Sequence, residues 1–234
     1  DIKKRLVLYK FKEFIKNSKN ARICHTYENA SIHDVERFLI YSEYDFLNIP
    51  NIGKGTLSNL LEVQEKTARY LDYVGKMLDA DCFVEEISFV YGINDGFMKS
   101  FYEKNKYVPM FWIMEQYYKK KIEEREWDIF VSRYKITKSY DQKTLEDLAK
   151  KHGLTRERVR QLEKCFPKDC YDFPCRQTDW EWYIETLMET NKFTTDTALS
   201  SILNKENCNF STEFALELLY WVFKDNYLYI GGLV

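Results

Sequence analysis

The 234-residue sequence predicts an all-α protein built from several small helical modules. Its eight glycines and four prolines are too few for a disordered or collagen-like chain, and its 45% hydrophobic and 17% aromatic residues can fill compact cores. Apolar residues recur at helical spacing along most of the chain. A short β strand is expected only near the C-terminus, in the segment NYLYIGG.

A turn between two helices is predicted near residue 50. In FLNIPNIGKGTLSNLLE, residues 46–62, an apolar helix end leads through Pro-Asn-Ile-Gly into a helix that opens at Gly53. Backbone N–H groups at such an opening form a phosphate site, which is how a helix-hairpin-helix grips DNA without reading its sequence. A plain helical hairpin explains the same pattern, so the turn alone leaves both interpretations open.

The longer stretch NARICHTYENASIHDVERFLIYSEYDFLNIPNIGKGTLSNLLE, residues 20–62, resembles the C-terminal domain of the bacterial RNA polymerase alpha subunit. The phosphate or minor-groove contacts that this resemblance implies are Arg22, Asn51, Gly53, Lys54 and Thr56. Gly55 and His25 depart from the family, which has lysine and asparagine at these positions. The departures imply that this module, extending to about residue 66, grips DNA more weakly or with an altered preference.

Residues 68–121 are rich in aromatic side chains that recur at helical spacing, as in FMKSFYEK and FWIMEQYYKK. Such rings can stack on the bases of single-stranded nucleic acid. Because the rings recur on helical faces and residues 68–118 carry 5 basic and 8 acidic residues, core packing is the favoured interpretation. The segment resembles no family that would assign it another role.

Two short helices that share one apolar seam are predicted in TLEDLAKKHGLTRERVRQLEKC, residues 144–165. The seam residues, spaced on either side of Gly153, are Leu145, Leu148, Ala149, Leu154, Val159 and Leu162. Thr144 and Asp147 form a pair like a capping box at the start of the first helix, and Thr155 is a suitable cap for the second. This pattern predicts a helix-turn-helix.

The second of these helices gathers polar side chains on the side opposite the seam, because residues three and four apart are neighbours on a helix. They are Arg156, Glu157, Arg160, Gln161 and Lys164. Arginine can bond guanine with two hydrogen bonds, glutamate can accept from cytosine and glutamine can match adenine. A solvated helix with alternating charges is the alternative, and the spacing alone does not decide between them.

The helix-turn-helix, together with EEREWDIFVSRYKI at residues 123–136, resembles region four of the bacterial housekeeping sigma factors over residues 123–166. The implied major-groove set is Arg156, Glu157, Arg160 and Gln161, in which Arg160 matches a position that holds the DNA backbone. We also expect Thr155 and Lys164 to lie on phosphates. The family's helix continues beyond this point, whereas here we expect Pro167 to end it.

The last part of the chain reads as three further helices, in TDWEWYIETLME, TDTALSSIL and STEFALELLYWVF. Residues 169–234 carry 4 basic and 11 acidic residues (−7), whereas residues 119–164 carry 14 and 9 (+5). The basic segment suggests a nucleic-acid face, and the acidic one suggests protein docking or an oligomer contact.

These features divide the chain into four expected modules. They are a helix-hairpin-helix module at 1–67, a helical connector at 68–121, the helix-turn-helix at 122–167 and an acidic helical module at 168–234.

Several classes of protein are not expected from this sequence. There is no run of about 18 uncharged apolar residues, so no membrane span or membrane partner is expected. There is no P-loop, G-x-S-x-G, H-E-x-x-H or dinucleotide glycine motif, so we expect no catalytic residue and no cofactor. The six cysteines lack a C-x-x-C pair and a nearby histidine, which favours reduced thiols in a cytoplasmic protein over a metal site.

The sequence therefore predicts a sequence-specific protein that binds double-stranded DNA, either a bacterial transcription regulator or a sigma-like factor. A second hypothesis is that the chain mimics sigma and alpha surfaces and binds RNA polymerase without reading DNA. Binding to duplex DNA that weakens steeply with salt separates the two, because only phosphate contacts release counterions.

Overall fold

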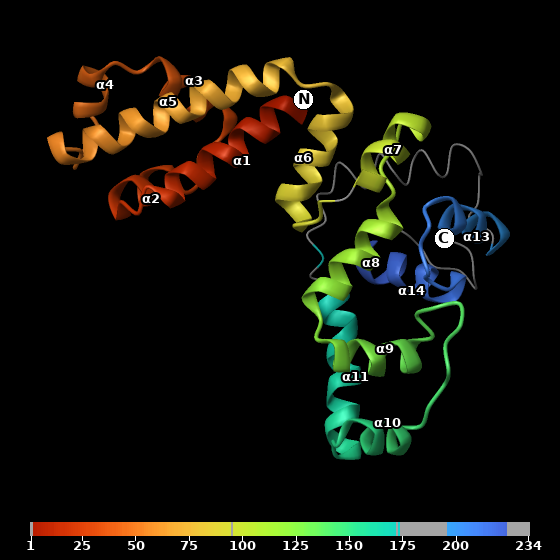
Figure 1. Cartoon of the computed structure of the whole chain (residues 1–234). Coiled ribbons are helices and arrows are strands. Elements are labelled where there is room, and N and C mark those ends of the chain that lie inside the picture. Colours follow the sequence, from red (N-terminus) through yellow and green to blue (C-terminus); the bar gives the residue numbers. More distant parts are fainter. Residues whose placement is uncertain (1, 95, 172, 174–195, 224–234) are drawn as a thin grey trace. The chain divides into compact units, whose positions relative to one another are not determined.

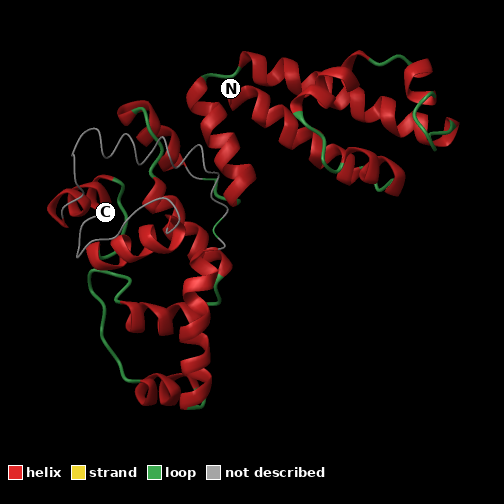
Figure 2. Ribbon diagram, turned by 180° about the vertical axis from the view of Figure 1, so that it is seen from behind, coloured by secondary structure: helices red, strands yellow, loops and turns green. Residues whose placement is uncertain are grey.

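The structure is a computed structural model that describes residues 2–94, 96–171, 173 and 196–223. The chain forms two compact units, unit 1 at residues 1–90 with 94–99 and unit 2 at residues 91–93 with 100–234. Within the described ranges every regular element is a helix (Figure 2), which confirms the all-α prediction. The expected strand in NYLYIGG and the expected helix in TDWEWYIETLME lie outside the described residues.

Unit 1 is a bundle in which a long helix packs beside the N-terminal helix (Figure 1). Its helices are α1 (Ile2–Asn17), α2 (Ala21–Tyr27), α3 (Ile32–Ile40), α4 (Glu43–Leu47), α5 (Lys54–Lys76) and α6 (Asp79–Tyr91). Side-chain caps fix the short helices. Asn20 accepts hydrogen bonds from the first turn of α2, and capping boxes formed by Ser31 with Asp34 and by Ser42 with Asp45 begin α3 and α4.

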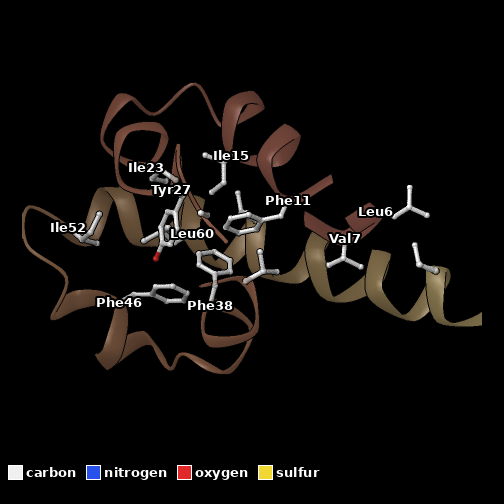
Figure 3. Close-up of a cluster of buried hydrophobic side chains, with 14 of the residues drawn as sticks. Leu6, Val7, Phe11, Ile15, Ile23, Tyr27, Phe38, Phe46, Ile52 and Leu60 are labelled. Atoms are coloured by element: carbon white, nitrogen blue, oxygen red, sulfur yellow. The ribbon is translucent and has the colours of Figure 1, made fainter. Parts of the chain in front are cut away.

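The core of unit 1 combines aliphatic side chains, such as Leu6 of α1 and Leu60 of α5, with a cluster of aromatic rings from α1, α2, α3 and α4 (Figure 3). Phe38 lies at its centre, with ring centroids 4.9 Å from Phe11, 5.2 Å from Tyr27 and 5.1 Å from Phe46, all edge to face. This geometry is the favoured one for aromatic pairs. The cluster fixes α2 and α4, and therefore the turn that leads into α5.

Unit 2 contains the remaining described helices, of which α7 begins in unit 1. They are α7 (Gly96–Asn105), α8 (Met110–Lys121), α9 (Glu124–Tyr134), α10 (Leu145–His152), α11 (Arg156–Tyr171), α13 (Asp196–Lys205) and α14 (Thr212–Phe223). Phe166 of α11 stacks on Phe130 of α9, with centroids 4.3 Å apart, and on Phe214 of α14 at 6.1 Å. Helices from both ends of the unit thus share one aromatic core.

Two buried carboxylates join α8 to the connection between α13 and α14. Glu206 accepts from the backbone N–H groups of Phe111 at 2.8 Å and Trp112 at 3.4 Å, which caps the start of α8. Glu115 accepts from the backbone and the side chain of Asn209 at 2.9 and 3.0 Å. The aromatic residues of this stretch serve packing, as predicted, since Phe111, Trp112 and their neighbours are buried.

The expected module boundaries fall at different points from the division into two units. Residues 67 and 68 both lie within α5, and residues 167 and 168 both lie within α11. α14 contacts α11 and α13 contacts α14, so the described C-terminal helices pack onto the same unit as the helix-turn-helix. The four-module division and the oligomer contact remain predictions.

Candidate nucleic-acid interface

The helix-turn-helix of unit 2 forms as the sequence predicts. Thr144 and Asp147 make a complete capping box at the start of α10, with the Asp147 N–H donating to Thr144 Oγ1 at 3.1 Å. α10 ends at Gly153, whose φ of 64° is the left-handed conformation that glycine adopts without strain. The next helix begins after Thr155, whose Oγ1 accepts from the Arg158 N–H at 3.1 Å.

The side chains at the centre of the apolar seam between α10 and α11 are buried. Leu148, Val159 and Ala149 are 0%, 0% and 4% exposed, and Leu162 is also buried, whereas Leu145 and Leu154 of the predicted seam are half-buried. Because this side of α11 faces α10, its polar residues are left on the opposite side. Arg156, Glu157, Arg158, Gln161 and Lys164 are exposed and Arg160 is partly so, and no described element covers them.

The charges on this outer face of α11 are partly paired with one another. Arg160 donates to both carboxylate oxygens of Glu157, at 2.7 and 2.6 Å, and Gln161 Nε2 donates to the same carboxylate at 3.3 Å. The hydrogen bonds from Arg160, with a smaller contribution from Gln161, lower the pKa of Glu157 to about 2, so it is ionised at neutral pH. Arg156 and Lys164 have no carboxylate partner within the described residues.

Helix α9 contacts both helices of the motif through side chains of Asp128 and Arg133. Its Asp128 accepts from Lys151 Nζ of α10 at 2.6 Å and lies 2.7 Å from His152 Nε2. Partial burial raises the pKa of Asp128, but the hydrogen bonds from Lys151 and His152 outweigh burial and leave this pKa below its ordinary value. Arg133 Nε donates to Glu163 Oε1 of α11 at 2.9 Å, which ties α9 to the second helix.

The expectation that Pro167 ends the second helix is wrong, because α11 continues through it to Tyr171. Proline lacks the N–H that would bond the Glu163 carbonyl one turn earlier. The hydroxyl of Tyr134 replaces that donor, at 2.7 Å from the Glu163 carbonyl oxygen. Farther along, the Tyr118 hydroxyl donates to the Cys170 carbonyl at 3.0 Å. Tertiary contacts thus supply what proline removes.

The sequence predicted the exposed residues of α11 but not the residues that hold the motif, which are Asp128 at α10 and Arg133 and Tyr134 at α11. All three lie in α9, which was expected only as the helix before the motif. Their side-chain and backbone partners in α10 and α11 are 23 to 30 positions away in the chain, so spacing within a helix gives no signal for them.

The second candidate contact lies at the start of α5 in unit 1. Asn51 adopts a left-handed φ of 67°, which asparagine tolerates, and its carbonyl accepts from Arg22 Nη1 at 3.3 Å. The structure therefore brings together Arg22 of α2 and the turn that the sequence singled out. Lys54 is exposed beside them, and a Cβ placed at Gly53 or Gly55 would meet no atom within 4 Å.

Thr56 differs from the other residues of this turn because it is only 7% exposed. Its position in the first turn of α5 is as expected, but its side chain packs inward. The open part of the turn consists of Asn51, Gly53 and Lys54, and α5 begins there without a side-chain cap.

Comparison with known proteins supports the helix-turn-helix of unit 2. Residues 120–165 match the family model for sigma-70, region 4. No curated protein and no solved structure gives a significant match to the chain. Region 4 is a helix-turn-helix DNA-binding domain without catalytic function, and the match supports a transcription-related DNA-binding role for this part of the chain. The resemblance of residues 20–66 to the alpha C-terminal domain is not confirmed.

Two other findings bear on the kind of site. The described residues include no group of three or more histidine, cysteine or acidic side chains placed to hold a metal ion. None of the described helices is both long enough and apolar enough to cross a bilayer.

Proposed function

We propose that the protein is a sequence-specific transcription regulator that inserts α11 into the major groove of promoter DNA. The observation that carries this proposal is the region 4 match over a helix-turn-helix whose polar outer face is left open by the rest of the described chain. A helix fits the major groove, where each base pair presents a distinct pattern of donors and acceptors.

The proposed base contacts come from Arg156, Glu157 and Gln161. Arg156 is exposed and has no carboxylate partner in the part of the chain that the structure describes, so its guanidinium can bond a guanine with two hydrogen bonds. Glu157 stays ionised and so can accept from cytosine, although it shares its oxygens with Arg160 in the free protein. The proposed contacts to DNA phosphates flanking these bases come from Arg160, Thr155 and Lys164.

Unit 1 is proposed to supply a second, weaker contact to the DNA backbone. Arg22 and Lys54 provide the cations, and the uncapped start of α5 provides backbone N–H groups beside Gly53. Because Thr56 is buried, we propose that it packs inside the turn and does not contact a DNA phosphate. Two contacts on one chain raise the effective concentration of each, so together they bind more tightly than either alone.

The test is a series of affinities for two duplexes, one carrying a sigma-type promoter hexamer and one with the same bases scrambled, at increasing salt. Neutralising several phosphates predicts a loss of orders of magnitude in affinity between about 50 and 200 mM salt, with a slope near −0.9 per phosphate. Preference for the hexamer should persist at every salt concentration. Equal affinity for the two duplexes would rule out base reading by α11.

A second candidate function is docking to RNA polymerase, which the region 4 match also suggests. A protein that only docks would co-purify with polymerase and bind duplex DNA weakly, with little dependence on salt. The same salt series therefore separates the two functions.

A further inference from the structure

Most lysines and arginines of unit 1 fall into two groups; Lys3, which donates to the Gly75 and Met77 carbonyls, belongs to neither. The members of one group each contact a carboxylate, in the pairs Lys4 with Glu36, Arg5 with Glu86, Lys10 with Glu13, Lys66 with Glu62, Arg69 with Glu65, Lys76 with Asp72 and Lys99 with Asp81. The members of the other group have no carboxylate partner within the described residues. They are Lys12, Lys16, Lys19, Arg22, Arg37 and Lys54.

All of the second group except Arg37 lie at one end of unit 1. Lys12, Lys16 and Lys19 belong to the last turns of α1 and the residues after it, whereas Arg22 begins α2 and Lys54 begins α5. These helix ends gather together in Figure 1, and the hydrogen bond from Arg22 to the Asn51 carbonyl joins α2 to the turn before α5. We call Lys12, Lys16 and Lys19 the α1 patch.

The α1 patch borders an open cavity of about 450 Å³ between α1 and α2. Lys12, Lys16 and His25 line the cavity, its apolar walls are Ile15, Ala21, Cys24 and Tyr27, and Glu28 is its one carboxylate. Lys12 and Lys16 are separated by one helical turn, about 6 Å along the axis, so they lie on the same face of α1. Each of them can therefore meet a different phosphate of an extended polyanion.

We propose that the α1 patch binds the phosphate backbone of duplex DNA next to the Arg22 and Lys54 contact. The inference rests on the proposed function, and it extends the DNA footprint of unit 1 onto a helix outside the segment that resembles the alpha C-terminal domain. Duplex DNA is favoured over an acidic protein because the patch is continuous with Arg22 and the turn at Asn51, which carry the proposed backbone contact. Flexible lysines suit a backbone ligand because they neutralise phosphates without selecting bases.

The test uses the full-length chain with Lys12→Gln, Lys16→Gln and Lys19→Gln combined, bound to the scrambled duplex over a range of salt. If each lysine neutralises one phosphate, the slope of log affinity against log salt should become shallower by about 2 to 3. Affinity at low salt should fall at least tenfold. Since these lysines are exposed, the urea midpoint of unfolding should stay at its wild-type value.

The matched control combines Lys4→Gln, Lys66→Gln and Lys76→Gln, which removes the same charge from ion-paired positions of the same unit. Its slope should equal that of the wild type. Equal changes in both variants would mean that only net charge matters, and this would overturn the inference.

A further pair of variants keeps the inference distinct from the proposed function. If Arg22→Gln with Lys54→Gln flattens the slope and the α1 variant does not, the inference is wrong while the proposed backbone contact stands. In that case, the unchanged slope of the α1 variant would favour an acidic protein, rather than DNA, as the ligand of the α1 patch. If the α1 variant flattens the slope although the wild type shows no hexamer preference, base reading by α11 fails and the inference stands.

Discussion

The two surfaces proposed to contact DNA arrange their charges differently. At the end of unit 1, Arg22, Lys54 and the α1 patch have no carboxylate partners in the described chain. On α11, Arg160 is held by both oxygens of Glu157, and Gln161 contacts the same carboxylate. Unpaired cations attract any phosphate backbone, whereas donors and acceptors in fixed positions discriminate between bases. From this comparison we propose that unit 1 contributes mainly affinity and that the paired groups of α11, together with Arg156, contribute sequence preference.

The two surfaces also differ in their support. The contact in unit 1 lies on an aromatic cluster built from α1 to α4. Helix α11 is held by Phe166 in the core of unit 2 and by Arg133 and Tyr134 of α9 at Glu163. Changes in these supports should therefore affect base preference in unit 2 and overall affinity in unit 1.

The largest effect is expected from Phe166→Ala. Phe166 is fully buried and stacks on Phe130, and truncating a buried phenylalanine costs about 3–5 kcal/mol of unfolding free energy. The variant should lose its preference for the promoter hexamer but keep weak, salt-sensitive binding to any duplex. Phe46→Ala is the matched change in unit 1. Phe46→Ala should weaken binding to all sequences. Urea unfolding measures the loss of stability in each variant, and titrations with the hexamer and scrambled duplexes measure the change in binding.

If Phe166→Ala unfolded at the wild-type urea concentration, the aromatic core of unit 2 would not be the support of α11. If Phe46→Ala changed hexamer preference instead of overall affinity, the assignment of the two roles would be reversed.

A smaller effect is expected from Tyr134→Phe. Removing the hydroxyl leaves the partly buried Glu163 carbonyl without its donor; an unpaired polar group costs about 1–3 kcal/mol when fully buried, so the loss here should lie at the low end of that range. In a Pro167→Ala background the restored N–H can bond that carbonyl, so the same change should cost less. Urea unfolding of the four proteins in this cycle gives the coupling. Equal costs in both backgrounds would show that Tyr134 does not substitute for the missing N–H.

A direct comparison of the two surfaces comes from Arg156→Ala and Lys54→Ala. Arg156→Ala should remove a contact of two hydrogen bonds to guanine, so the preference for guanine at one position of the hexamer should fall by about 1–3 kcal/mol. Losing Lys54 should weaken binding to every duplex alike and reduce the salt slope by about 1. Titrations of single-base variants of the hexamer distinguish these outcomes. A uniform loss for Arg156→Ala would place that residue on phosphate.

The smallest effect is a dependence of stability on pH at Asp128. Because its pKa in the folded protein lies below the ordinary value of 3.8, its ion pairs stabilise the fold above that pH and lose their effect as pH falls through the lowered pKa. Partly exposed ion pairs contribute about 0–1 kcal/mol. Asp128→Asn should therefore lower stability slightly at pH 7, and its difference from the wild type should shrink as pH falls below 3.8. A difference that does not change with pH would show that ionisation of Asp128 is irrelevant.

The sequence predicts the local features of the fold well. Thr144, Gly153 and Thr155 each act within a few residues of their own position, and the structure shows the capping box, the left-handed turn and the cap that they predict. The outer face of α11 is equally predictable, because burial of Leu148 and Val159 decides which residues remain outside.

What the sequence could not predict depends on contacts between distant segments. Pro167 was expected to end a helix on local grounds, but the Tyr134 hydroxyl, which comes from another helix, bonds the carbonyl that proline leaves unpaired. Thr56 was placed on DNA by position, whereas the packing of α5 buries it. The pairing of Glu157 with Arg160 is local, yet whether these charges meet each other or a ligand is not determined by spacing.

The most direct test of the central claim is selection of duplexes from a random-sequence pool by the wild-type protein and by Arg156→Ala, followed by sequencing. If α11 reads bases in the major groove, the wild type enriches a common motif, and Arg156→Ala loses the preference at one or two adjacent positions while keeping the rest. A wild-type pool without any enriched motif, or an identical motif from both proteins, would contradict the account.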